Sequence, residues 1–265
     1  MTAVELHDAT LGEGTPPVVL LHGYTASGLD WADVQEPLAV GREVISYDHR
    51  GHGQSPKLGT GAAYTFDLLL EDVVAALQRR GGQPVHVVGH SMGGIIAMRL
   101  ATERPDLVRS LLVSSCGPES TGAIPVLLLK VLTVMGRTLG MSTAHKVVTT
   151  LLRRGKAQQG TPQRRAELEA RSARSISVMD PHAFLALGLE LNTYPSLLAG
   201  LRNLAIPATF MVGADDTALR EAAAVMADAV PGAHLVVVED ARHNPHQDQP
   251  KVWLHAVEEH LDRSR

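Results

Sequence analysis

The chain has 265 residues, of which 45% are hydrophobic and 20% are charged, and its formal net charge is −4. This length and composition predict one or two domains with a substantial core and exclude a disordered or collagen-like chain. The mildly acidic balance argues against nucleic acid as a partner, because phosphate-binding domains are usually basic. The single cysteine, Cys116, excludes an intramolecular disulfide. With no visible signal peptide and no apolar run long enough for membrane insertion, a cytoplasmic protein is expected.

The first half of the chain alternates short apolar runs with helical patterns. The runs are rich in residues that favour β-strands and are bounded by Gly and Pro, which is typical of buried parallel strands. They lie at 18–21, 43–47, 85–89 and 107–114. Helices are predicted over 66–80, where Gly81-Gly82 ends the pattern, and over 92–103.

The same alternation returns near the C-terminus. Strands are predicted at 208–213 and 234–238, with helices at 219–229 and 252–261. Such alternation predicts an α/β fold with a mostly parallel central sheet and helices on both of its faces.

Residues 118–200 interrupt this rhythm with helical periodicity alone. The predicted helices are 125–139, 145–153, 162–175 and 181–191. The segment carries a net charge of +5, which leaves −9 for the remainder. A solvated helical face is the simpler interpretation of that charge, and attraction of anionic substrates is the alternative. We therefore expect a core of residues 1–117 and 201–265 with a helical insertion between them.

The strongest chemical signal is Gly89-His90-Ser91-Met92-Gly93, which fits the pattern G-x-S-x-G. An apolar strand precedes it and a helix follows it, so the serine would stand on a sharp strand-to-helix turn. The start of the helix adds positive potential and free N–H groups for a developing oxyanion. Ser91 is the predicted nucleophile.

A second signal, His22-Gly23-Tyr24, directly follows the strand 18–21. A loop there can bring a backbone N–H beside the serine turn. The predicted oxyanion donors are therefore the backbone N–H groups of Tyr24 and Met92.

A serine hydroxyl needs a base, and the base needs an orienting carboxylate. His243 follows the last strand and would reach the same sheet edge as Ser91; His246 is the competing candidate. Asp215 and Asp216 both follow the strand 208–213, and Asp216 is favoured. Capping of the next helix is the structural alternative for either aspartate.

Four signals in this order make the chain resemble the α/β-hydrolase superfamily: His22-Gly23, the turn Asp48–Ser55, Gly89–Gly93, and the pair Asp216 and His243. The turn itself is interpreted as mainly structural. The resemblance covers nearly the whole chain apart from most of 118–200. The N-terminus departs from typical members, because only Ala3–His7 could form a strand before 18–21, so the sheet is expected to lack its first edge strand.

The resemblance implies an α/β-hydrolase fold with Ser91 as nucleophile, Asp216 as acid and His243 as base. It also implies that the insertion 118–200 is a helical cap over the site. Epoxide hydrolases and haloalkane dehalogenases of this fold carry Asp at the nucleophile position, so Ser91 sets them aside. The chain looks most like small capped esterases and lactonases.

Apolar side chains of the insertion could line an acyl pocket, which would favour a small to medium hydrophobic substrate. The candidates are Ile124, Val126, Leu127, Val131, Met135, Met141, Phe184, Leu187 and Leu191. For each of them, packing inside the insertion is the structural alternative.

The predicted function is hydrolysis of a small-molecule carboxylic ester through an acyl-enzyme. Lactone, enol-lactone or carbon–carbon bond hydrolysis by the same triad is the alternative, and a ligand-binding receptor without turnover is another. No cofactor and no metal are expected, since the histidines show no recognisable ligand spacing. A homodimer is compatible with the sequence.

Overall fold

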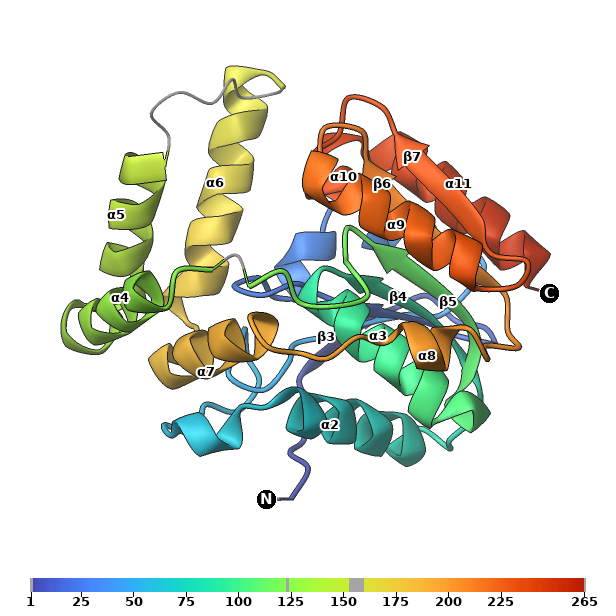
Figure 1. Cartoon of the computed structure of the whole chain (residues 1–265), viewed down its shortest axis with the longest axis horizontal. Coiled ribbons are helices and arrows are strands. Elements are labelled where there is room, and N and C mark those ends of the chain that lie inside the picture. The colour runs from blue at the N-terminus through green and yellow to red at the C-terminus, as the bar shows by residue number, and fades with distance from the viewer. Residues whose placement is uncertain (1, 123, 153–159, 265) are drawn as a thin grey trace.

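The computed structural model describes residues 2–122, 124–152 and 160–264. A seven-stranded sheet runs through it in the order β1-β3-β2-β4-β5-β6-β7. Figure 1 labels strands β3 to β7 of this sheet. Strands β2 to β7 are parallel and β1 pairs antiparallel with β3, so the predicted mostly parallel sheet is confirmed. The strands are β1 (Asp8–Leu11), β2 (Val18–Leu21), β3 (Val44–Tyr47), β4 (Val85–His90), β5 (Val108–Ser114), β6 (Ala208–Gly213) and β7 (His234–Val238).

Helices cover both faces of the sheet and bury two separate apolar clusters. Alternate residues of β2 face opposite ways: Val19 joins the cluster under α2, α3 and α9, while Val18 joins the cluster under α1 and α11. Every residue of β2 is fully buried, which explains its uninterrupted apolar sequence. The core helices are α1 (Gln35–Leu38), α2 (Phe66–Arg79), α3 (Met92–Glu103), α8 (Leu198–Leu201), α9 (Thr217–Ala229), α10 (Pro245–Asp248) and α11 (Pro250–Arg263), with short 3₁₀ turns η1 (Gly28–Trp31), η2 (Gly61–Ala63) and η3 (Pro105–Leu107).

Between β5 and β6 the chain forms a group of helices that stands beside the sheet, at the left of Figure 1. These are α4 (Val126–Leu139), α5 (Met141–Leu152), α6 (Pro162–Ser177) and α7 (Pro181–Leu191), here called the helical insertion. The described residues of 118–200 contain no strand, as the periodicity predicts. Helix α5 begins four residues earlier than predicted, and its predicted end at Arg153 lies outside the described residues. No described helix is long and apolar enough to cross a membrane.

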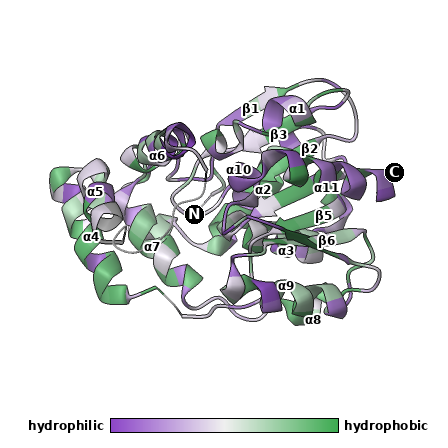
Figure 2. Ribbon diagram, turned by 90° about the horizontal axis from the view of Figure 1, so that it is seen from above, coloured by the Kyte–Doolittle hydropathy of each residue, from purple (hydrophilic) through white to green (hydrophobic). Residues whose placement is uncertain are grey.

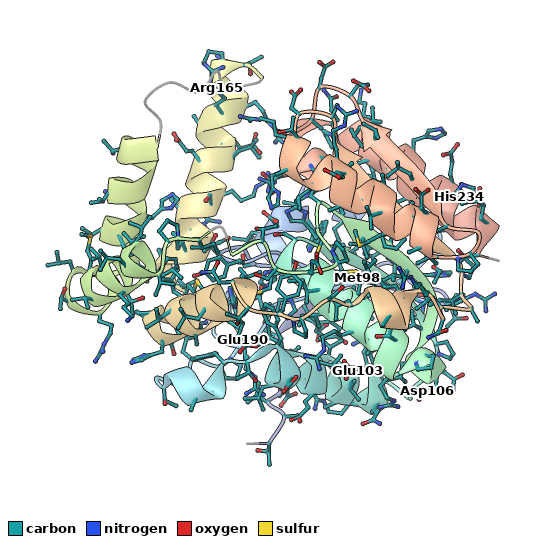
Figure 3. All side chains as sticks on the ribbon, in the orientation of Figure 1. Met98, Glu103, Asp106, Arg165, Glu190 and His234 are labelled. Carbon is teal, nitrogen blue, oxygen red and sulfur yellow. The ribbon has the colours of Figure 1, made fainter. Side chains whose placement is uncertain are left out.

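Side chains of the insertion reach the core at several places. Arg164 and Arg171 of α6 both bind the carboxylate of Asp33, with N–O distances of 2.6 and 2.7 Å at their closest. At the other end of the insertion, Glu190 of α7 accepts a hydrogen bond from the backbone N–H of Phe66 at the start of α2; Figure 3 labels Glu190. These contacts fix the insertion over the carboxyl edge of the sheet.

The expectation that the sheet lacks an edge strand before β2 is wrong. Strand β1 forms at Asp8–Leu11, directly after the segment Ala3–His7. The backbone N–H groups of Val4 and His7 instead donate to the side chains of Asp72 and Ser55, so this segment joins no ladder. Because β1 is short, polar and mostly exposed, its sequence lacks the apolar run by which the other strands were predicted.

Candidate active site

The turn between β4 and α3 presents Ser91 in a strained backbone conformation. Ser91 has φ 52° and ψ −119°, a combination that a non-glycine residue rarely adopts. A Cβ on Gly93 would lie 2.1 Å from the carbonyl oxygen of Leu21, and one on Gly89 would lie 2.3 Å from the carbonyl oxygen of Gly93. The two glycines of the pattern are therefore required by backbone packing, which holds the serine hydroxyl clear of the sheet.

Ser91, His243 and Asp216 form one chain of hydrogen-bonding contacts. The Nε2 atom of His243 lies 3.1 Å from the Oγ atom of Ser91. Its Nδ1 atom lies 2.8 Å from the Oδ2 atom of Asp216. The side chain of His243 is 48% exposed and that of Asp216 is 13% exposed. The carboxylate is thus shielded while the imidazole remains accessible, as a base that exchanges protons with substrate and water must be.

Backbone contacts explain why Asp216 and His243 meet. The loops after β6 and β7 are joined by a hydrogen bond from the N–H of Asp215 to the carbonyl of Ala241, 2.9 Å long. They also approach so closely that a Cβ on Gly213 would lie 2.2 Å from the carbonyl oxygen of Arg242. In this arrangement it is Asp216 whose carboxylate contacts the imidazole of His243.

The competing histidine, His246, lies behind the site. Its ring is fully buried, stands 3.3 Å from a carboxylate oxygen of Asp30 and packs against Trp31. His90 lies between the two candidates, with Nε2 2.9 Å from the Oδ1 atom of Asn244. Burial lowers the pKa of His90 well below its ordinary value, so this ring stays neutral beside His243.

One group of described side chains has the composition and spacing of a metal site. The ligand atoms of Asp30, His90 and His246 all lie within 4.8 Å of one another. Each ring nitrogen of His90 already has a neighbouring oxygen within hydrogen-bonding distance, the carbonyl oxygen of Ser114 at 3.2 Å and the Oδ1 atom of Asn244 at 2.9 Å. These three side chains can therefore also be explained without a metal, as polar residues that support the loop carrying His243.

The loop after β2 runs beside the serine turn. A Cβ on Gly23 would lie 3.3 Å from the Cβ atom of Ser91. In the described part of the chain no hydrogen bond engages the backbone N–H of Tyr24 or of Met92, so both are available as donors. The hydroxyl of Tyr24 donates to the carbonyl of Phe184, and the two rings stack with centroids 5.5 Å apart. Helix α7 thus holds the loop in place.

The turn Asp48–Ser55 contacts the loop that follows β2 and stabilises it. The carboxylate of Asp48 accepts hydrogen bonds from the backbone N–H groups of Gly28 and Gln54, both 2.7 Å long. The N–H of His49 donates to the Nε2 atom of His22 at 3.1 Å. These contacts agree with a structural role for the turn.

A cavity of about 460 Å³ opens beside Ser91 and His243. Core residues and the insertion share its wall, so it lies where the two parts of the molecule meet. Its apolar lining includes Ile95, Cys116, Ile124, Leu168, Leu191 and Leu219. Burial raises the pKa of the Cys116 thiol to about 12, which leaves it an unreactive part of this wall.

The prediction of the pocket wall holds for two residues, because Ile124 and Leu191 line this cavity. Three of the other predicted residues, Val126, Leu127 and Val131, are exposed to solvent at 42%, 75% and 49%. The remaining four follow the structural alternative and pack inside the insertion or against the core: Met135, Met141, Phe184 and Leu187.

Sequence reasoning missed the contribution of α6 and a buried ion pair. Leu168, Ser172 and Ser175 of α6 line the cavity, although this helix reads as highly polar. Arg50 binds the carboxylate of Asp72 through two hydrogen bonds of 2.5 and 2.6 Å, with both side chains almost fully buried. No local sequence pattern predicts an ion pair between two residues that are 22 positions apart.

The sequence itself decides the family. A model of the family described as the alpha/beta hydrolase fold matches residues 16–250. The chain belongs to the α/β-hydrolase family. It is 29% identical to a pimeloyl-[acyl-carrier protein] methyl ester esterase from Aeromonas salmonicida, over 93% of this chain and 95% of the relative. A protein of the same name from Chromobacterium violaceum is 30% identical over 96% of each chain.

Solved structures of α/β-hydrolases share the fold over nearly the whole chain. An enol-lactonase from Burkholderia xenovorans LB400 superposes with a TM-score of 0.81 at 22% identity, covering 97% of this chain and 96% of its own. Est816, described as an N-acyl homoserine lactone degrading enzyme, gives a TM-score of 0.76 at 27% identity with the same coverage. The first of these likenesses concerns the fold alone.

Proposed function

We propose that this chain is a serine hydrolase that cleaves small to medium carboxylic esters through an acyl-enzyme. The observation that carries the proposal is the contact chain from Ser91 through His243 to Asp216. Two relatives at 29% and 30% identity, both named as methyl ester esterases, support an ester as the substrate class.

In the first half of the reaction, His243 takes the proton of Ser91 as the oxygen attacks the ester carbonyl. Asp216 orients the imidazole and stabilises the imidazolium that forms. The negative charge on the carbonyl oxygen is met by the backbone N–H groups of Tyr24 and Met92, and one such donor is typically worth about 3 kcal/mol in the transition state. The C–O bond then breaks, and the alcohol leaves with the proton from His243.

In the second half, water attacks the acyl-enzyme and gives its proton to His243. The same two N–H groups stabilise the second tetrahedral intermediate. Its collapse returns the proton to Ser91 and releases the acid. Because His243 is half exposed, water reaches it without any rearrangement of the core.

The cavity sets the proposed substrate size. Its volume of about 460 Å³ is within the usual range for a small-molecule site. Leu168 and Ser175 from α6 close it against the core, so we propose that the insertion 118–200 acts as a cap on the core formed by 1–117 and 201–265. The mixed lining suits a short acyl chain that bears a polar group better than a long unbranched lipid chain.

A lactone is the second candidate substrate, because ring opening of a lactone is the same acyl transfer with the alcohol kept on the product. The likeness to Est816, at 27% identity over 97% of this chain, favours it. Lactone and open-chain ester of equal carbon number, offered in separate assays, would separate the two.

Hydrolysis of p-nitrophenyl acetate, butyrate and octanoate by the wild type and by Ser91→Ala tests the proposal. We expect wild-type turnover beyond one equivalent, strongest with the shorter esters, and a loss of at least about 10³-fold in the variant. Sustained turnover also excludes a receptor that binds without reacting.

Ser115→Ala is the matched control, because Ser115 lines the same cavity and also has a positive φ, 49°. It should keep wild-type activity within about tenfold, since no step uses its hydroxyl. Absence of wild-type turnover on every ester and lactone, or full activity of Ser91→Ala, would contradict the proposal.

A further inference from the structure

Helix α4 presents an apolar face to solvent on the outside of the insertion. Leu127, Val131 and Val134 recur at helical spacing, so they lie along one side of the helix, and their exposures are 75%, 49% and 60%. Leu139 at the end of the helix is 65% exposed. Figure 2 shows α4 as a mostly hydrophobic ribbon at the edge of the molecule remote from the sheet. A contiguous apolar ridge of this kind marks an interaction surface.

The charge around this ridge has one sign. No acidic residue occurs anywhere in the segment 120–166, which contains eight Lys and Arg residues. Lys130 and Arg137 are both exposed and stand two helical turns apart along one edge of the ridge. Neither has an ion-pair partner in the part of the chain that the structure describes. The ridge is therefore bordered by unneutralised positive charge.

We propose that the outer face of α4 docks the protein on an anionic lipid surface. An aliphatic stripe flanked by Lys and Arg is the composition of helices that lie in the membrane interface with their apolar side toward the acyl chains. A fluid lipid surface needs no shape complementarity, which suits a convex ridge without a groove. The ridge contributes binding by burial, and the cations contribute attraction to the headgroups.

Two other occupants fit less well. A second copy would bring two basic faces together, and like charges at an interface oppose association. Protein partners are recognised mainly through aromatic and Arg anchors seated in pockets, whereas no aromatic residue occurs between Phe66 and Phe184. The acidic remainder of the molecule, with its net charge of −9, would be turned away from the anionic surface.

Only the start of α4 lies near the cavity wall. Ile124 lines the cavity, and α4 begins two residues later at Val126. The proposed docking does not depend on the proposed ester hydrolysis, because binding can be measured without any reaction.

Sedimentation with vesicles tests the docking. The wild type is mixed with vesicles of phosphatidylcholine alone and of phosphatidylcholine with phosphatidylglycerol. We expect binding to the anionic vesicles that weakens in high salt, and little binding to the neutral ones. The double variant Leu127→Glu/Val134→Glu should bind the anionic vesicles at least about tenfold more weakly. Lys130→Gln/Arg137→Gln should also weaken binding, by about five- to tenfold per charge removed.

The matched control is Val40→Glu/Val225→Glu, which makes the same change in charge at valines that are 77% and 42% exposed. Val40 follows α1 and Val225 belongs to α9, both on the side of the molecule away from α4 (Figure 2). This control should bind like the wild type, and thermal unfolding checks that every variant is folded. No binding to anionic vesicles, or equal loss in the control, would overturn the proposal. Retention on immobilised polyglutamate without vesicle binding would overturn it in favour of an acidic protein partner.

Discussion

The sheet core and the helical insertion hold their side chains by different means. In the core, glycines such as Gly93 and Gly213 let backbone pack directly on backbone, within 2.1 and 2.2 Å of where a Cβ would stand. In the insertion, the corresponding close neighbour of Gly136 is the flexible side chain of Met141. The insertion is joined to the core largely through side chains, as between α6 and Asp33. The contrast indicates that backbone contacts fix the core, whereas the insertion can adjust its side chains more easily.

The largest expected effect is on the rate of ester hydrolysis, and a second variant tests the preference among esters separately. Asp216→Asn should lower kcat by about 10³- to 10⁴-fold for every ester, because the amide no longer holds the imidazole in the right tautomer. Leu168→Ala, in the cavity wall contributed by α6, should instead change the preference among acyl chain lengths by about tenfold or less. Steady-state kinetics on the p-nitrophenyl ester series measures both. If Leu168→Ala instead lowered kcat strongly and equally for every ester, the proposed difference between core and insertion would be wrong.

The next prediction concerns the close packing around two glycines, one in the core and one in the insertion. Gly93→Ala should destabilise the fold by about 3 kcal/mol or more, because its Cβ would meet the carbonyl of Leu21 and neither can yield. Gly136→Ala should change stability by no more than about 1 kcal/mol, since Met141 can move aside and alanine favours the helix. Urea unfolding of the two variants gives the difference. Equal costs would mean that the insertion is as rigid as the core.

Buried histidines make the core sensitive to acid. Burial lowers the pKa of His52 to about 3, below the ordinary value near 6.5 that it regains on unfolding. The unfolded chain therefore binds the additional proton between about pH 6.5 and 3, and stability falls as the pH falls through that window. His52→Gln should reduce the slope of unfolding free energy against pH by up to about 1.4 kcal/mol per pH unit. Urea unfolding at a series of pH values between 3 and 7 measures this slope, and an unchanged slope in His52→Gln would contradict the prediction.

The contact between Asp33 and α6 should give the smallest effect. Burial opposes ionisation of Asp33, but hydrogen bonds from Arg171 and Arg164 lower its pKa to about 2. A carboxyl with a lowered pKa stabilises the fold above its unfolded value near 4, and this contribution is lost as the pH falls toward 2. Asp33→Asn should thus cost about 1 kcal/mol at pH 7, and the difference from wild type should shrink below about pH 4.

Thermal unfolding between pH 3 and 7 follows this difference. Asp106→Asn is the control, because Asp106 pairs with Arg104 on the surface of the core. It should leave the melting temperature unchanged. A rise in KM for Asp33→Asn with unchanged kcat would further indicate that the contact positions the insertion over the cavity.

The sequence predicted those features that have a local cause. In the sequence, parallel strands appear as apolar runs because both of their faces are buried. The serine turn appears as glycines at fixed spacing because the backbone packs too closely there for a Cβ atom. The contact of Asp216 with His243 followed from the topology, since both loops leave the same edge of the sheet.

The cavity wall and the ties of the insertion could not be predicted in this way. Arg164 and Asp33 are 131 residues apart, so no local spacing connects them. On α4 the usual rule that apolar residues face inward fails, because the stripe at Leu127 and Val131 is exposed. Helix α6 reads as solvent-exposed and yet closes the cavity through Leu168, because orientation in the insertion is set by tertiary contacts.

All of α4 to α7 lies within the single connection from β5 to β6, two strands that are neighbours in the sheet. A recombination event with one breakpoint after Ser114 and one before Ala208 would therefore replace the whole insertion and leave Ser91, Asp216 and His243 in place. Under the proposed function, descendants of such an exchange would inherit the reacting residues from one parent and the cap from the other. Asp33 sets the compatibility condition, because a donor segment without a cation opposite it would leave that carboxylate unpaired at the join.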